Sequence, residues 1–305
     1  MFMYSLVYGL RICALLLLQM KPDLTRIVRM ELRQAAFNAF KSTDLESKLD
    51  LASVLLDSSA TLTIASDATI ASHTEPGAPP KPLVINPLQV DKRSPFTVDG
   101  HAALVHAICH IEFNAINLAL DAIWRFPGMP DTYYRDWAKV AQEEAYHFRL
   151  LRTHLQTLQD QDSGQKSTET YDYGSFPAHG GLWAMCEKTK DDIVARMALV
   201  PRTLEARGLD ATPQIQVKLR KANTQRARDA VAILDIILND EIGHVAIGNH
   251  WYRWLCRRDG LDPLAHYAVL HTKHTAPRLK PPFNHAARLQ AGFTAEELQF
   301  LQELV

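Results

Sequence analysis

Apolar residues recur every three or four positions over four long segments of the chain, and this is the period of an α-helix. The segments lie at about 99–125, 132–158, 179–208 and 224–258. Residues 30–57 show the same period over one or two shorter helices, and a last short helix is expected to end at Val305. The predicted fold class is all-α, a four-helix bundle with N-terminal helices and an extended C-terminal tail.

The same pattern divides the chain into parts. Residues 74–82 read TEPGAPPKP, a connector typical of loops, and residues 159–170 form a second polar break. The predicted organisation is an N-terminal extension at 1–29 that need not belong to the fold, helices and a Pro-rich connector at 30–98, the bundle at 99–258, and a tail packing on it at 259–305.

Residues 1–20 contain an apolar run, from Ile12 to Leu18, that could suggest targeting or a membrane. The run is much shorter than the ~20 residues that a membrane span needs. No basic segment precedes it, and no small-residue cleavage site follows. We therefore expect a cytoplasmic protein without a membrane anchor.

Composition narrows the class of protein further. The 305 residues are 47% hydrophobic and 22% charged, which excludes wholesale disorder, and a net charge of −1 argues against a protein that coats nucleic acid. The four cysteines form no CxxC pair, so neither a disulfide scaffold nor a zinc ribbon is indicated. No glycine-rich phosphate loop is present.

Several acidic and histidine residues occupy helix faces that are otherwise apolar. Glu112 shares a face with Ile108 and Ile116. Two Glu-x-x-His pairs, Glu144 with His147 and Glu241 with His244, stand in the middle of apolar faces in the second and last helices. An ionised carboxylate in a dry interior is costly unless a counter-charge compensates it. A metal cluster would supply that charge, and this ligand pattern is that of di-iron carboxylate bundles.

The positions along the helices agree with a shared site. The turn FPGMP is centred near residue 128, with Glu112 and Glu144 each 16 residues away from it. In an antiparallel hairpin both residues then lie at nearly the same height.

A fourth carboxylate is less well defined by the pattern. Glu205 is the natural partner, but Pro201 and Gly208 interrupt its helix and Pro213 follows. Glu205 reaches the site only if the chain turns near Asn223 rather than at 208–213. Glu187, five turns earlier on the same face, is the alternative ligand.

Other polar residues are expected to be ordinary surface groups. His106 and His110 lie on a polar stripe of the first helix together with Asn114, Asn117 and Asp121, which predicts a solvated face. Glu143 points about 100° away from Glu144 and is interpreted as a surface acid. The tail histidines 266, 271 and 274 are interpreted in the same way. Tyr146 lies near the site and is a candidate for the layer of residues around the ligands.

The chain resembles the ferritin-like superfamily over about residues 100–258. The segments EEAYH at 143–147, LVPRTLEARGLDATP at 199–213, NDEIGHVAIG at 239–248 and PPFNHAARLQAGF at 281–293 resemble more narrowly a mainly bacterial family known as domain of unknown function 455. The resemblance implies a ferritin-like bundle with a di-iron or iron/manganese centre, two metal ions per chain. Its ligand pattern carries over to Glu112, Glu144, His147, Glu205, Glu241 and His244. Asp240 matches the aspartate that, in the similar ribonucleotide reductase radical subunits, bonds a ligand histidine.

The function expected is an oxygen-dependent oxidase or hydroxylase whose substrate is a small molecule or a modified nucleoside, supplied by an electron donor if it is an oxygenase. The alternatives are a ferroxidase or iron-handling protein, and an RNA-associated helical protein or tRNA-modifying hydroxylase. A basic tail, with seven Lys or Arg against two Asp between Trp251 and Gln290, leaves nucleic acid as a partner that is not favoured. No membrane partner is expected.

Overall fold

The computed structural model describes residues 31–71, 74–159 and 170–303, so the apolar run near the N-terminus and most of the second polar break lie outside the described residues. Helices dominate, and the described residues contain no β-strand, only two isolated bridges. The predicted all-α fold class is confirmed.

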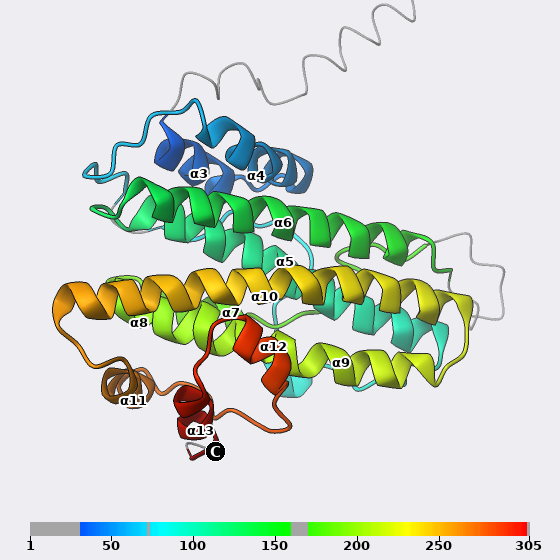
Figure 1. Ribbon diagram of the computed structural model, residues 1–305. Helices are drawn as coiled ribbons and strands as arrows, with labels where there is room; N and C mark the ends of the chain where they lie inside the picture. Colours follow the sequence, from blue (N-terminus) through cyan, green and yellow to red (C-terminus); the bar gives the residue numbers. More distant parts are fainter. Residues whose placement is uncertain (1–30, 72–73, 160–169, 304–305) are drawn as a thin grey trace, which may run out of the picture.

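Four helical arms form the bundle (Figure 1). Helix α5 (Val98–Arg125) and helix α6 (Asp131–Gln156) make an antiparallel hairpin, and helix α10 (Gln225–Asp259) lies along α6. The remaining arm is composite: α8 (Ile193–Leu199), a π-helical segment η2 (Val200–Glu205) and α9 (Ala206–Arg220). A separate short helix, α7 (Gly181–Lys188), precedes it. The third predicted helix is therefore interrupted between Lys188 and Ile193.

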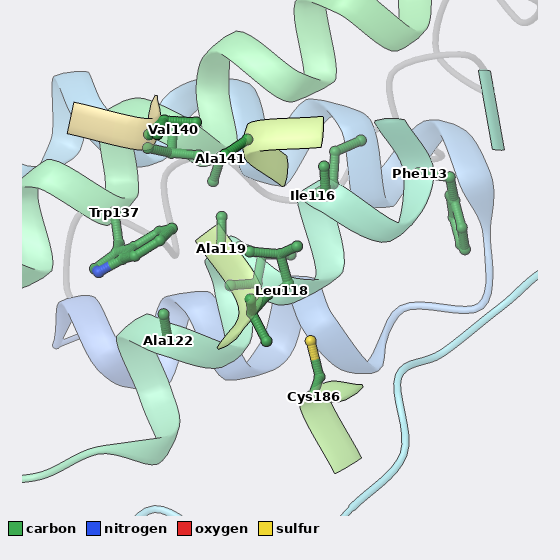
Figure 2. Close-up of a cluster of buried hydrophobic side chains, with 14 of the residues drawn as sticks. Phe113, Ile116, Leu118, Ala119, Ala122, Trp137, Val140, Ala141 and Cys186 are labelled. Carbon is green, nitrogen blue, oxygen red and sulfur yellow. The ribbon is translucent and has the colours of Figure 1, made fainter. Parts of the chain in front are cut away.

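Small side chains let the α5–α6 hairpin pack closely. Ala115, Ala119 and Ala122 on α5 and Ala138, Ala141 and Ala145 on α6 recur at helical spacing, and all are buried. Figure 2 shows part of this core, where Ile116 and Ala119 lie among Trp137, Val140 and Ala141. The hairpin provides two of the inward faces on which the candidate ligands lie.

A second layer covers the other side of α5. Helices α3 (Leu32–Lys41) and α4 (Leu45–Ser59) pack against α5 and α6, and the buried guanidinium of Arg33 donates to the carbonyls of Ile123 and Trp124 at the end of α5. A short 3-10 turn, η1 (Pro87–Gln89), lies in the connector that follows.

The prediction of a solvated polar stripe on α5 is wrong. His106, His110, Asn114, Asn117 and Asp121 are all buried. Each of these residues bonds protein through at least one polar atom, although His106 Nδ1, His110 Nε2 and Asn117 Nδ2 have no partner among the described residues. His106 Nε2 accepts from the Gly174 N–H at 3.0 Å, Asn117 accepts from the buried Lys48 ammonium at 2.7 Å, and Asp121 pairs with Arg125 and Arg196. Helix α5 is buried on both sides, so its polar face contacts protein rather than water.

Helix α5 is also long and apolar enough to cross a membrane by length and composition. However, 72% of its most apolar 18-residue window is buried inside the protein. The helix therefore has the burial of a core helix, and no membrane is indicated.

The tail contains more helix than the pattern predicts. Beyond Gly260, whose φ of 66° ends α10, the chain forms α11 (Pro263–Lys273), α12 (His285–Gln290) and α13 (Ala295–Glu303). Asp262 caps α11 and Pro263 occupies its first turn, a start signal that the periodicity alone did not reveal. The tail packs on the composite arm, where Arg288 binds Asp210 and Glu297 binds Arg202.

Candidate metal centre

Side chains from three helices converge at mid-height in the bundle. Glu112 of α5, Glu144 and His147 of α6, and Glu241 of α10 each offer one ligand atom, and these atoms all lie within 4.8 Å of one another. Glu112, Glu144 and His147 are buried. The equal spacing of Glu112 and Glu144 from the hairpin turn thus places both carboxylates beside the same imidazole, at 3.6 and 3.4 Å from His147 Nδ1.

The second Glu-x-x-His pair faces the first. His244 Nδ1 lies 2.9 Å from Glu144 Oε1 and 3.4 Å from Glu241 Oε1, and the two imidazole rings have centroids 5.8 Å apart. Each histidine therefore directs Nδ1 toward the carboxylates. Glu144 lies between the two imidazoles and contacts both.

Several of these atoms are buried without a hydrogen bond. Among the described residues, Glu112 Oε2, both oxygens of Glu144, and the Nδ1 atoms of His147 and His244 have no partner with hydrogen-bond geometry, despite their short separations. Leaving one such group unsatisfied in a protein interior costs about 1–3 kcal/mol. Acceptor oxygens and nitrogen lone pairs that point at one another are compatible with a cation among them, so these residues fit a metal.

The pKa values in the cluster also show that its buried carboxylates lack a compensating charge. Burial and the negative charge of Glu144 raise the pKa of Glu112 to about 8. Burial alone would lower the pKa of His147, but the carboxylates of Glu112 and Glu144 outweigh it and raise that pKa to about 11. Without a metal, the cluster therefore takes up protons to balance its charge. A bound cation would replace those protons.

Glu205 reaches the same region because the composite arm does not turn at 208–213. Helix α9 continues through Pro213 to Arg220, and α10 begins at Gln225, so the turn lies near Asn223. The π-helical segment accommodates Pro201, and the Thr203 hydroxyl donates to the Ala198 carbonyl five residues earlier. π-Segments of this kind are frequent at functional sites.

The carboxylate of Glu205 is buried, and neither of its oxygens has a hydrogen-bond partner among the described residues. Burial, followed by the negative charges of Glu241 and Glu144, raises its pKa well above the usual range. Glu205, Glu112 and Glu241 line one cavity. Glu205 is therefore close enough to the cluster for the charges of Glu241 and Glu144 to affect it, although it is not one of the four residues whose ligand atoms lie within 4.8 Å of one another.

The two imidazoles are held from behind by carboxylates of the opposite helix. His147 on α6 bonds through Nε2 to Asp240 of α10 at 3.0 Å, and His244 on α10 bonds through Nε2 to Glu143 of α6 at 2.9 Å. Asp240 thus contacts one of the two histidines of the cluster. Glu143 is partly exposed and is not one of the clustered ligands, but it is more than a surface acid because it is one half of this reciprocal pair.

A signal for Glu143 was present in the sequence. Each Glu-x-x-His is preceded directly by another acid, in EEAYH and in DEIGH. The residue before the glutamate lies on the flank of the helix that faces the neighbouring histidine. Only the contact between α6 and α10 shows that the acid of one motif serves the histidine of the other.

Two other candidates lie away from the cluster. Glu187 is on α7, where its Oε1 accepts from Lys190 at 2.6 Å. Tyr146 is 49% exposed and borders a shallow outer recess with Gln142 and Arg149. The structure does not bring either side chain into the cluster of candidate ligands.

Comparison with known proteins agrees with the narrower of the two resemblances. The family described as "Protein of unknown function (DUF455)" matches residues 32–299, which include every candidate ligand. An uncharacterized protein of Haemophilus influenzae is 49% identical over 233 residues, covering 74% of this chain and 76% of that protein. No solved structure matches significantly.

Proposed function

The chain belongs to the DUF455 family of proteins of unknown function, and from its own site we propose that it is a dinuclear-metal oxidoreductase with a ferritin-like bundle. Its ligands would be Glu112, Glu144, His147, Glu205, Glu241 and His244. They would hold two iron ions, or one iron and one manganese. The supporting observation is the set of buried, mutually facing carboxylate and imidazole atoms without hydrogen bonds.

The donor set supports this choice of metal. Carboxylate oxygens and imidazole nitrogens suit iron and manganese, and the set contains no thiolate. Bound iron would supply electron transfer to oxygen, as expected of an oxidase or hydroxylase. The chain itself contributes the geometry: Asp240 and Glu143 fix the orientation and tautomer of His147 and His244.

A cavity of about 680 Å³ favours chemistry on an organic substrate over iron handling. It has Glu112, Glu205 and Glu241 in its wall and is lined mainly by apolar side chains. A cavity of this size is typical of small-molecule sites. A ferroxidase needs a path for ions only, so a roomy apolar chamber beside the carboxylates supports the oxidase or hydroxylase.

Anaerobic titration with ferrous iron tests the ligand assignment. We expect close to two ions per chain in the wild type, fewer than one in Glu144→Ala, and a loss of about one in Glu205→Ala. Glu187→Ala is the matched control, because it removes a carboxylate of the neighbouring α7 that already binds Lys190, and it should leave the stoichiometry unchanged. Stoichiometry that is unaffected by Glu144→Ala would show that the cluster does not bind metal.

Oxygen consumption by the iron-loaded protein separates the two enzymatic alternatives. An oxidase or hydroxylase consumes oxygen in proportion to an organic substrate. Continued oxygen uptake driven by added ferrous iron alone, with a growing ferric mineral, would instead identify an iron-handling protein.

A further inference from the structure

The cavity beside the carboxylates lies between α5, α7, α9 and α10, with tail residues 277–281 across it. On α9 and the π-segment before it, the lining residues Leu204, Gly208, Ala211 and Ile215 recur at helical spacing. They form one face. Glu205 lies on the buried flank of this face, whereas Arg207 lies on its exposed flank. The cavity therefore extends from the metal-binding group toward solvent.

Branched aliphatic side chains and one methionine form much of the apolar part of the wall. Ile108 and Ile111 come from α5, Leu182 and Met185 from α7, and Leu234 and Ile237 from α10. Ile111 is 50% exposed although it is large and apolar. Such a surface is stabilised when a hydrocarbon body covers it.

Two cations border the outer part of the cavity. Arg207 of α9 and Lys280 of the tail both line it, both are exposed, and within the described ranges no acid pairs with either. Asp210 also lines the cavity, but Arg288 already binds it at 2.6 Å and 3.0 Å. An anionic group entering the outer part of the cavity would therefore meet two cations that no acid of the described ranges pairs with.

Gly208 keeps the middle of the α9 face open. A β-carbon added there would have no atom within 4 Å, and its φ does not require glycine. Glycine inside a helix costs about 0.5–1 kcal/mol relative to alanine. Neither close packing nor backbone conformation accounts for this cost, whereas room for a ligand does.

We propose that the cavity binds an amphiphilic organic acid. Its hydrocarbon body would lie along Ile108, Ile111 and Ile237, with its carboxylate or phosphate at Arg207 and Lys280 and its far carbon atoms toward Glu112 and Glu205. That this ligand is the substrate rests on the proposed oxidoreductase function. The binding itself does not, because it depends on the cavity alone.

Calorimetric titration of the metal-free full-length protein with dodecanoate, dodecyl phosphate and dodecanol tests this assignment. At least one of the two anions should bind ten or more times as tightly as the alcohol, and the one that does identifies the preferred head group. The double variant Arg207→Gln/Lys280→Gln should lose this preference and retain alcohol binding. The control Lys218→Gln/Arg278→Gln removes two exposed cations of α9 and the tail that do not line the cavity, and should bind like the wild type.

Gly208→Leu provides an independent measurement. Leucine should fill the open face and weaken all three probes at least tenfold without lowering the melting temperature, since it is the better helix former. Equal binding of anion and alcohol, no effect of the Arg207/Lys280 variant, or no binding of any probe would each overturn the proposal. If dodecanoate binds but iron does not, the oxidoreductase function is wrong and the cavity assignment stands. If iron binds but no probe does, the cavity assignment is wrong and the oxidoreductase function stands.

Discussion

Each histidine of the cluster is oriented by an acid from the other helix. The Nε2 atoms of His147 and His244 bond Asp240 and Glu143, which leaves both Nδ1 atoms directed at Glu144. Such a bond sets the tautomer of an imidazole and makes its other nitrogen a better ligand. The two outer acids are therefore part of the site even though they do not face its centre.

Removing either outer acid should weaken metal binding without abolishing it. We expect Asp240→Ala and Glu143→Ala each to reduce affinity for ferrous iron about 10–100-fold, which is the usual effect of losing such a partner. Competition with a chelator under anaerobic conditions measures this affinity. Lys139→Ala is the control: it removes the 2.7 Å pair between Lys139 and Glu143 but leaves the bond from Glu143 to His244. Wild-type affinity in both acid variants would exclude the orienting role.

At the scale of elements, the composite arm decides whether Glu205 belongs to the site. Its π-segment packs directly on α10, where a β-carbon at Gly248 would lie 2.5 Å from Pro201 Cβ. The segment is held from the other side by the tail, because the buried Arg202 pairs with Glu297 at 2.8 Å. The arm thus keeps its irregular backbone because it is clamped between α10 and α13.

Two glycines of α10 should respond in opposite ways to alanine. Gly248→Ala should destabilise the protein by about 1–3 kcal/mol, because the new methyl group overlaps Pro201. Gly243→Ala meets no atom within 4 Å and should be neutral or stabilising by up to about 1 kcal/mol. Denaturant unfolding measures both free energies. A similar change in the two variants would mean that α10 does not pack closely on the π-segment.

At the scale of the whole molecule, the buried polar face of α5 should make stability depend on pH. Burial lowers the pKa of His106 to about 4, against an ordinary value near 6.5. Between these values the unfolded chain binds more protons than the folded one, so His106 reduces the free energy of unfolding as the pH falls through this window. Protonation at Nε2 would also displace the N–H of Gly174.

A comparison of wild type with His106→Gln isolates this contribution. The glutamine oxygen can still accept from Gly174, but the side chain does not titrate. The variant should therefore gain about 2 kcal/mol relative to wild type between pH 7.5 and 4.5. Unfolding in urea at each pH gives this difference in the free energy of unfolding. A constant difference between wild type and His106→Gln would show that His106 titrates normally.

Much of this molecule was determined by local sequence. The helical period predicts the four arms, and the spacing of Glu112 and Glu144 from the Pro-Gly turn predicts their common height, because rise per residue is a property of the helix itself. The two Glu-x-x-His pairs also follow from helix geometry, because side chains at i and i+3 are always neighbours. Their place on apolar faces is what indicates a metal.

What only the tertiary structure decided depends on contacts between distant segments. The polar stripe of α5 is typical of a solvated face until α3, α4 and the 173–174 segment cover it, since periodicity reports the polarity of a face and not its neighbour. Glu143 acquires its role only where α6 meets α10. Glu205 reaches the cavity only because packing supports a π-segment that local propensity, with Pro201 and Gly208, opposes. Each outcome depends on which surfaces meet, and pairing between elements is set by the folded chain as a whole.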